Sequence, residues 1–174
     1  DARHGHVRLS ARNESGRRRM TYLEDIVVGA KRSFGHYEVT AAEIIDYGKL
    51  YDDQPFHTDP EAAKDSVFGG LIASGWHTCA MFMRMACDAQ DPDHGLAGLG
   101  SPGFDDLKWL MPVRPGDILS AQTKVLSATP SRSKHDRGTV RIQIRIFNQK
   151  DEAVLEMISM GRYLRRPAEA TAET

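Results

Sequence analysis

Residues 75–88 read Gly-Trp-His-Thr-Cys-Ala-Met-Phe-Met-Arg-Met-Ala-Cys-Asp, and this stretch decides the fold. Its apolar residues occupy nearly every side of the helix that the stretch predicts, so almost no polar face remains. A helix that is apolar all round is buried and does not rest on a surface. We therefore predict a helix over residues 75–88 that other parts of the chain wrap.

The C-terminal half of the chain supplies strands that could cover this helix. Apolar residues alternate with polar ones at Val140, Ile142, Ile144 and Ile146, the period of a strand with one buried face. Further strands are predicted over 33–39, 104–111, 117–128 and 153–165, with a polar hairpin loop over 129–138. Strands gathered after an apolar helix favour an α+β domain in which an antiparallel sheet curls around one helix.

A shorter helix is predicted upstream, beginning after Thr40. Thr40 and Glu43 form a capping-box pattern, and the next residues place apolar side chains on one helical face. Pro55 limits this helix, because the residue before a proline avoids the α region. Residues 52–60 are therefore predicted as a loop, and residues 61–65 as a helical turn that Asp59 caps.

The composition is that of one globular domain. The chain has 174 residues, 40% hydrophobic and 27% charged, with a formal net charge of -1. This charge gives no electrostatic reason to expect nucleic acid or a membrane as partner, and no apolar run reaches the about 20 residues of a membrane span. Cys79 and Cys87 lie about 12 Å apart on the predicted helix, too far for a disulfide. Free thiols favour a cytoplasmic location.

The domain itself is predicted to span residues 20–166. Residues 1–19 contain six arginines among small and polar residues and have little to bury. This composition is typical of a disordered leader, or of an added segment that does not belong to the domain. Residues 167–174 are predicted to be a disordered tail.

Three motifs carry a family resemblance. They are Tyr-Asp-Asp-Gln-Pro-Phe-His-Thr-Asp-Pro at 51–60, Phe-Gly-Gly-Leu-Ile-Ala-Ser-Gly-Trp at 68–76 and Leu-Lys-Trp-Leu-Met-Pro-Val-Arg-Pro-Gly-Asp at 107–117. In this order they resemble the signatures of the MaoC-like, R-specific (type 2) enoyl-CoA hydratases. The resemblance implies a hot-dog fold, a curved antiparallel β-sheet wrapped around a long central helix. Gln54 stands where the family usually has Asn, and Ser74 where it usually has His.

The resemblance assigns Asp52 and His57 as the catalytic pair that holds a water and moves protons. Gly75 is the candidate oxyanion donor, because free N–H groups and the positive end of the helix dipole meet at a helix N-terminus. Glycine also lets a thioester approach the backbone. The other predicted substrate-binding residues are Gln54, Phe56, Ser74 and Trp76; together with Trp109 they suggest an aromatic-lined pocket.

Each assignment has a structural alternative. Asp52 could simply end its helix, His57 could hydrogen bond within its loop, and Gly75 could permit tight packing. Ser74 is predicted to cap the helix at 75–88, and His77 to be a satisfied core histidine. The sequence contains no metal-ligand spacing. The basic residues Arg132, Lys134 and Arg137 are interpreted as a solvated loop and not as a coenzyme A site.

The predicted function is a hydro-lyase that reversibly hydrates a trans-2-enoyl-CoA to an R-3-hydroxyacyl-CoA. Coenzyme A is part of the substrate, and no separate cofactor is expected. One alternative is an acyl-CoA thioesterase, because a fold does not fix a function. Another is a non-catalytic acyl-CoA-binding partner subunit. The resemblance also implies a homodimer or a higher homo-oligomer, and exposed edge strands favour such pairing.

Overall fold

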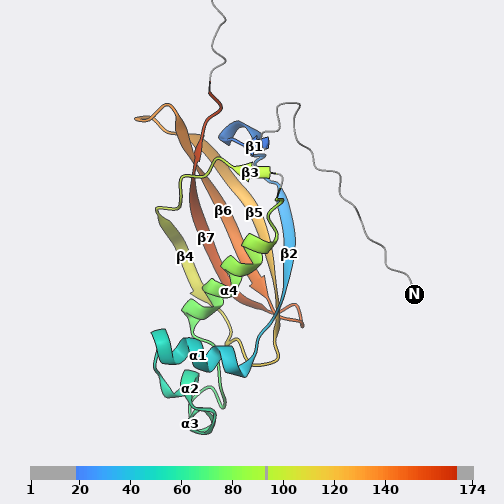
Figure 1. Ribbon diagram of the computed structural model, residues 1–174, viewed down its shortest axis with the longest axis vertical. Coiled ribbons are helices and arrows are strands. Elements are labelled where there is room, and N and C mark those ends of the chain that lie inside the picture. Colours follow the sequence, from blue (N-terminus) through green and yellow to red (C-terminus); the bar gives the residue numbers. More distant parts are fainter. Residues whose placement is uncertain (1–18, 93, 168–174) are drawn as a thin grey trace, which may run out of the picture.

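A five-stranded antiparallel sheet and one long helix organise the computed structural model, which describes residues 19–92 and 94–167. The sheet order is β2-β5-β6-β7-β4, so β2 and β4 form its edges (Figure 1). The strands are β2 (Lys31–Glu38), β4 (Gly103–Trp109), β5 (Ile118–Pro130), β6 (Arg137–Phe147) and β7 (Ala153–Leu164).

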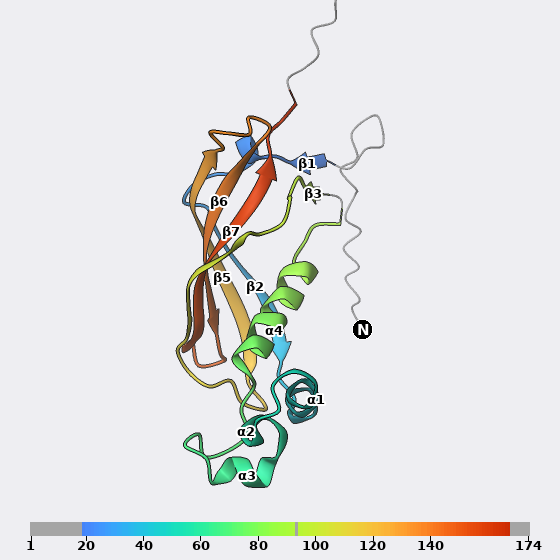
Figure 2. The same cartoon turned by 90° about the vertical axis from the view of Figure 1, so that its left-hand side faces the viewer.

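Helix α4 (Gly75–Asp88) lies against one face of this curved sheet, as Figure 2 shows. Its bounds are those predicted, and Met81, Phe82 and Met85 join the core. The expected alternation in β6 is present, with Val140, Ile144 and Ile146 at most 4% exposed. The α+β hot-dog architecture is thereby confirmed.

Within one chain, the sheet covers only one side of α4. Trp76 and Met83 are 58% and 52% exposed. A single sheet covers one side of a helix, so the apolar residues on the opposite side of α4 face outward.

Three short helices lie at one end of the sheet: α1 (Ala41–Tyr51), α2 (Pro55–Thr58) and α3 (Pro60–Lys64). The loop predicted over 52–60 is therefore wrong in part. Pro55 and Pro60 each occupy the first position of a helix, where the missing N–H costs nothing and the fixed φ suits the helix. Asp59 caps α3 as predicted, because its Oδ1 accepts bonds from the N–H groups of Glu61 and Ala62.

Two very short strands, β1 (Arg19–Thr21) and β3 (His94–Leu96), pair in parallel near the other end, beside the 3-10 helix η1 (Leu23–Asp25). The sequence did not predict these elements. The loop predicted over 129–138 is shorter than expected, since β5 continues to Pro130 and β6 begins at Arg137. Within this chain, that hairpin lies at the end of the sheet opposite α1, α2 and α3 (Figure 1).

The predicted leader, residues 1–19, lies outside the described residues except for Arg19, with which β1 begins. The predicted tail, 167–174, lies outside them except for Pro167. None of the helices in the described part of the chain has the length and apolar character needed to cross a membrane.

Candidate active site

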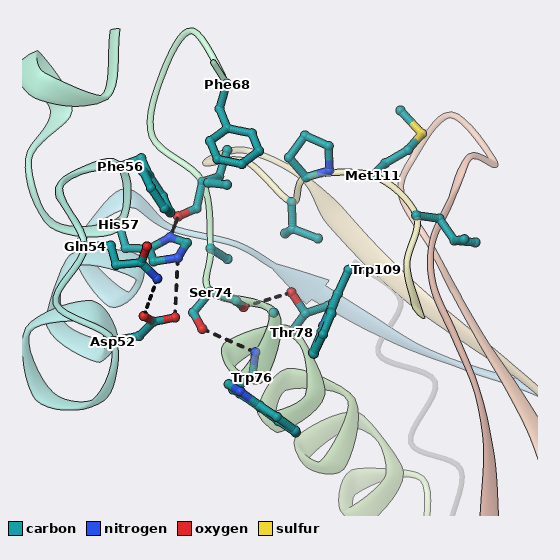
Figure 3. Close-up of a pocket in the computed structure, with 16 residues that line it drawn as sticks. Asp52, Gln54, Phe56, His57, Phe68, Ser74, Trp76, Thr78, Trp109 and Met111 are labelled. Atoms are coloured by element: carbon teal, nitrogen blue, oxygen red, sulfur yellow. Dashed lines mark hydrogen bonds and ion pairs between the residues drawn. The ribbon is translucent and has the colours of Figure 1, made fainter. Parts of the chain in front are cut away.

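A cavity of about 510 Å³ opens where α2, the first turn of α4 and the segment after β4 meet (Figure 3). The structure brings all the predicted site residues to it. The residues predicted from the sequence that line this cavity are Asp52, Gln54, Phe56, His57, Ser74, Gly75 and Trp76.

Asp52 is the C-cap of α1, and its N–H donates to the carbonyl of Gly48 at 2.8 Å. Its carboxylate Oδ1 accepts a hydrogen bond from Gln54 Nε2, also at 2.8 Å. This bond, followed by one from Ser74, holds the pKa of Asp52 below its usual value. Asp52 is therefore a carboxylate at neutral pH.

His57 lies on α2 and is 4% exposed. Its Nδ1 is 2.7 Å from the carbonyl oxygen of Ile72, and its Nε2 is 3.4 Å from Oδ2 of Asp52. Because a carbonyl can only accept, Nδ1 carries a proton and donates it to Ile72. Nε2 faces the Asp52 carboxylate, as the dashed line between the two side chains in Figure 3 shows.

Gly48 lets α1 approach α2 closely enough for this arrangement. A Cβ atom at Gly48 would lie 2.9 Å from Cγ2 of Thr58 and 3.0 Å from the carbonyl oxygen of His57. The absence of a side chain at Gly48 thus helps to bring the C-terminus of α1, with Asp52, beside α2 and its histidine.

The N-terminus of α4 forms the opposite wall. Buried Ser74 caps the helix as predicted, with its Oγ accepting from the N–H of Trp76 at 3.3 Å. Gly75 is the first helical residue, so its N–H has no acceptor within the helix. The indole of Trp109 packs so closely that a Cβ atom at Gly75 would lie 2.4 Å from it.

The remaining walls are mostly apolar, and four of their residues are aromatic. The ring of Phe56 makes edge contacts with His57 and Phe68, at centroid distances of 4.6 and 5.1 Å, and Trp76 meets Trp109 at 5.4 Å. Sequence reasoning assigned no role to Phe68, Thr78 or Met111, which also line the cavity. Phe68 begins the motif at 68–76, which carries part of the family resemblance. Its place in that motif could have indicated a site residue.

In the described ranges, 19–92 and 94–167, no three His, Cys, Asp or Glu side chains gather where they could hold a metal ion. Cys79 and Cys87 are free thiols on α4. The predictions of no metal, no separate cofactor and a cytoplasmic location stay predictions.

Fold and site together define a hot-dog domain with an Asp–His pair at an apolar cavity. The family model described as the MaoC like domain matches residues 26–145. The chain belongs to this family.

Individual proteins are also similar to this chain. The chain is 42% identical to the MaoC-like dehydratase from Rhodospirillum rubrum, whose crystal structure superposes with a TM-score of 0.77 over 85% of this chain and 99% of that one. An uncharacterised protein of Bacillus subtilis (strain 168), YdeM, is 25% identical over 77% of this chain and 92% of its own length. The 3-hydroxybutyryl-CoA dehydratase of Methylorubrum extorquens is 25% identical over 67% of this chain and 71% of its own length.

Proposed function

We propose that this protein is a hydro-lyase that adds water reversibly across the double bond of a trans-2-enoyl-CoA. The observation that carries the proposal is the approach of two proton-transfer groups at the cavity wall, Oδ2 of Asp52 and Nε2 of His57, 3.4 Å apart. With Nε2 unprotonated, both atoms accept, and a water can donate to both of them. Membership of a family that includes dehydratases supports the same reaction.

In the proposed reaction, the water oxygen bonds to Cβ of the substrate while the Asp52–His57 pair accepts one of its protons. The electron pair of the double bond moves toward Cα and the thioester oxygen, where the Gly75 N–H stabilises the negative charge. The pair then delivers a proton to Cα, which completes the 3-hydroxyacyl-CoA. The pair acts as a unit, so we assign no separate acid and base. The R configuration is proposed from the motif resemblance.

The cavity favours an uncharged acyl group. Its ionisable lining residues are Asp52 and His57, and no lysine or arginine lines it. Arg114 lies next in sequence to lining residue Val113, but its guanidinium donates to the carbonyl of Phe68 at 2.6 Å. A second carboxylate on the acyl group would lie against apolar walls and near the negatively charged Asp52. Burial of that second carboxylate is therefore unfavourable.

A panel of enoyl-CoA thioesters tests both parts of this proposal. We expect hydration of straight-chain, branched or aromatic 2-enoyl-CoAs, and at least about tenfold lower kcat/KM for an enoyl-CoA that carries a second carboxylate. Release of free thiol from saturated acyl-CoA in place of hydration would show a thioesterase. Binding without turnover would show the partner-subunit alternative.

A further inference from the structure

A second histidine–carboxylate pair lies next to the candidate active site and takes no part in the proposed reaction. His77 on α4 places its Nε2 3.8 Å from Oε1 of Glu43 on α1. The ring of Tyr47, one turn after Glu43, stacks on His77 with a centroid distance of 4.4 Å and an interplanar angle of 5°. Tyr37 of β2 donates to Oε2 of Glu43 at 3.4 Å.

Part of this cluster is buried without hydrogen bonds. Among the described residues, the buried side-chain polar atoms without a partner are Oε1 of Glu43 and Nδ1 of His77. His77 is 6% exposed, so the prediction that it is a satisfied core histidine is wrong. An unpartnered buried polar atom lowers stability, because its lost hydration is not replaced by a hydrogen bond. An apolar pair of similar volume would fit such an interface at least as well.

Burial disfavours the charged form of each group. Burial, followed by an unfavourable electrostatic interaction with nearby His57, lowers the pKa of His77 to about 4. Burial raises the pKa of Glu43, against hydrogen bonds from Tyr37 and Thr40 that lower it. Both shifts disfavour the charged forms of these two groups beside the Asp52–His57 pair.

The position of the pair links the two halves of the candidate site. Glu43 and Tyr47 belong to α1, whose C-cap is Asp52. His77 follows Gly75, the candidate oxyanion donor, by two residues on α4. A shift of α1 along α4 therefore moves the Asp52 carboxylate relative to the Gly75 N–H, and His77 contacts α1 through two side chains that lie one turn apart.

We propose that His77 and Glu43 are a positioning pair, which holds α1 against the first turn of α4 and so sets Asp52 opposite Gly75. This role rests on the proposed hydration activity. It explains why a polar pair with unpartnered atoms occupies an interface where apolar side chains would be at least as stable.

The test replaces the pair by apolar residues in the double variant Glu43→Leu/His77→Phe, in which a phenyl ring can still stack on Tyr47. We expect kcat for hydration to fall about tenfold with little change in KM. A displacement of Asp52 relative to Gly75 mainly weakens the binding of the transition state. The thermal midpoint should stay equal to that of the wild type or rise by a few degrees. The single variant Glu43→Gln, which keeps a hydrogen-bonding side chain beside His77, should retain most of the wild-type kcat.

A matched control is Asp46→Leu, an apolar substitution at an exposed position of the same helix, which should leave kcat unchanged. Wild-type kcat in the double variant would overturn the proposal, since the pair would then have no positioning role. A joint fall of kcat and thermal midpoint would also overturn it, since the pair would then be a structural contact alone.

A readout without turnover separates this proposal from the proposed function. Carbon-13 NMR of labelled aspartate follows the Asp52 carboxyl, assigned by its absence in Asp52→Asn. We expect the apparent pKa of Asp52 to move by about half a unit or more in the double variant. An unchanged titration would overturn the positioning role even if the wild type hydrated no enoyl-CoA, whereas a shifted titration in an inactive protein would contradict only the proposed function.

Discussion

The polar residues of the site depend on one another for their position. Gln54 was predicted to bind substrate, and in the structure its side-chain amide donates to Asp52, while its backbone carbonyl accepts from the backbone N–H of His57 and the hydroxyl of Thr58. The side-chain amide at position 54 thus holds Asp52, and the backbone carbonyl there anchors the turn that carries His57. The extra methylene of glutamine relative to asparagine is accommodated within this arrangement.

His77 leads to a prediction about pH and stability. Its pKa is about 4 in the folded protein against an ordinary 6.5, so between these values the unfolded chain binds a proton that the folded chain does not. Stability from this residue is therefore present above pH 6.5 and is lost as the pH falls toward 4. The loss is about 3 kcal/mol at most, and the raised pKa of Glu43 offsets part of it.

We expect His77→Phe to remove this loss. Urea unfolding at pH 6.5 and at pH 4.5 should show a smaller decrease in the free energy of unfolding for the variant than for the wild type. Equal decreases in the two proteins would contradict the burial of a neutral His77.

At the scale of elements, the close approach of α4 to the segment after β4 shapes the site. Because a Cβ atom at Gly75 would lie 2.4 Å from the Trp109 indole, Gly75→Ala must displace that ring or the helix N-terminus. We expect kcat for hydration to fall by about tenfold or more, since the substitution disturbs both the oxyanion donor and the aromatic wall.

Gly98→Ala is the matched control for this substitution. A Cβ atom at Gly98 meets nothing within 4 Å, so this variant should retain wild-type kinetics. Full activity of Gly75→Ala would show that neither the N–H at this position nor the packing of Trp109 matters for turnover.

The elements that the sequence predicted best are those with a long periodic pattern. Helix α4 was predicted with its observed bounds, and β6 from its alternation, because each buries many residues of one period. Strands β1 and β3 have three residues each, too few for a period to appear. Helix α2 was missed because Pro55 was considered only as the end of one helix and not as the start of the next.

The same limit applies to side chains that act across elements. Of the predicted capping box only the N-cap half is present, in which Thr40 Oγ1 accepts from the N–H of Glu43 at 3.2 Å. That the Glu43 carboxylate faces Tyr37 and His77 depends on how α1 packs on β2 and α4. Neither propensity nor spacing contains that information.

At the scale of the whole molecule, the sheet ends in the exposed edge strand β4, where Phe104 is 49% exposed. The outward side of α4 also carries Trp76 and Met83. Such surfaces are typical of sites where another chain binds. The homodimer suggested by the sequence stays a prediction, and this edge is where we expect it to form.

Light scattering after size exclusion tests this prediction. We expect the wild type to be a dimer or larger, and Phe104→Lys to shift it toward the monomer, because a lysine on an edge strand opposes pairing. Thr129→Lys adds the same charge to the interior strand β5 and should leave the assembly unchanged. A monomeric wild type would contradict the prediction.

Asp52→Asn tests the central claim of the proposed function most directly. The amide keeps the size of the side chain but removes the proton acceptor, so on a 2-enoyl-CoA that the wild type hydrates we expect kcat to fall about 10²- to 10⁴-fold. KM and the thermal midpoint should stay close to wild-type values, and Asp53→Asn, at the exposed neighbouring carboxylate, should remain fully active. Loss of the enoyl absorbance at the wild-type rate in Asp52→Asn would contradict the assignment of Asp52 and His57 as the catalytic pair.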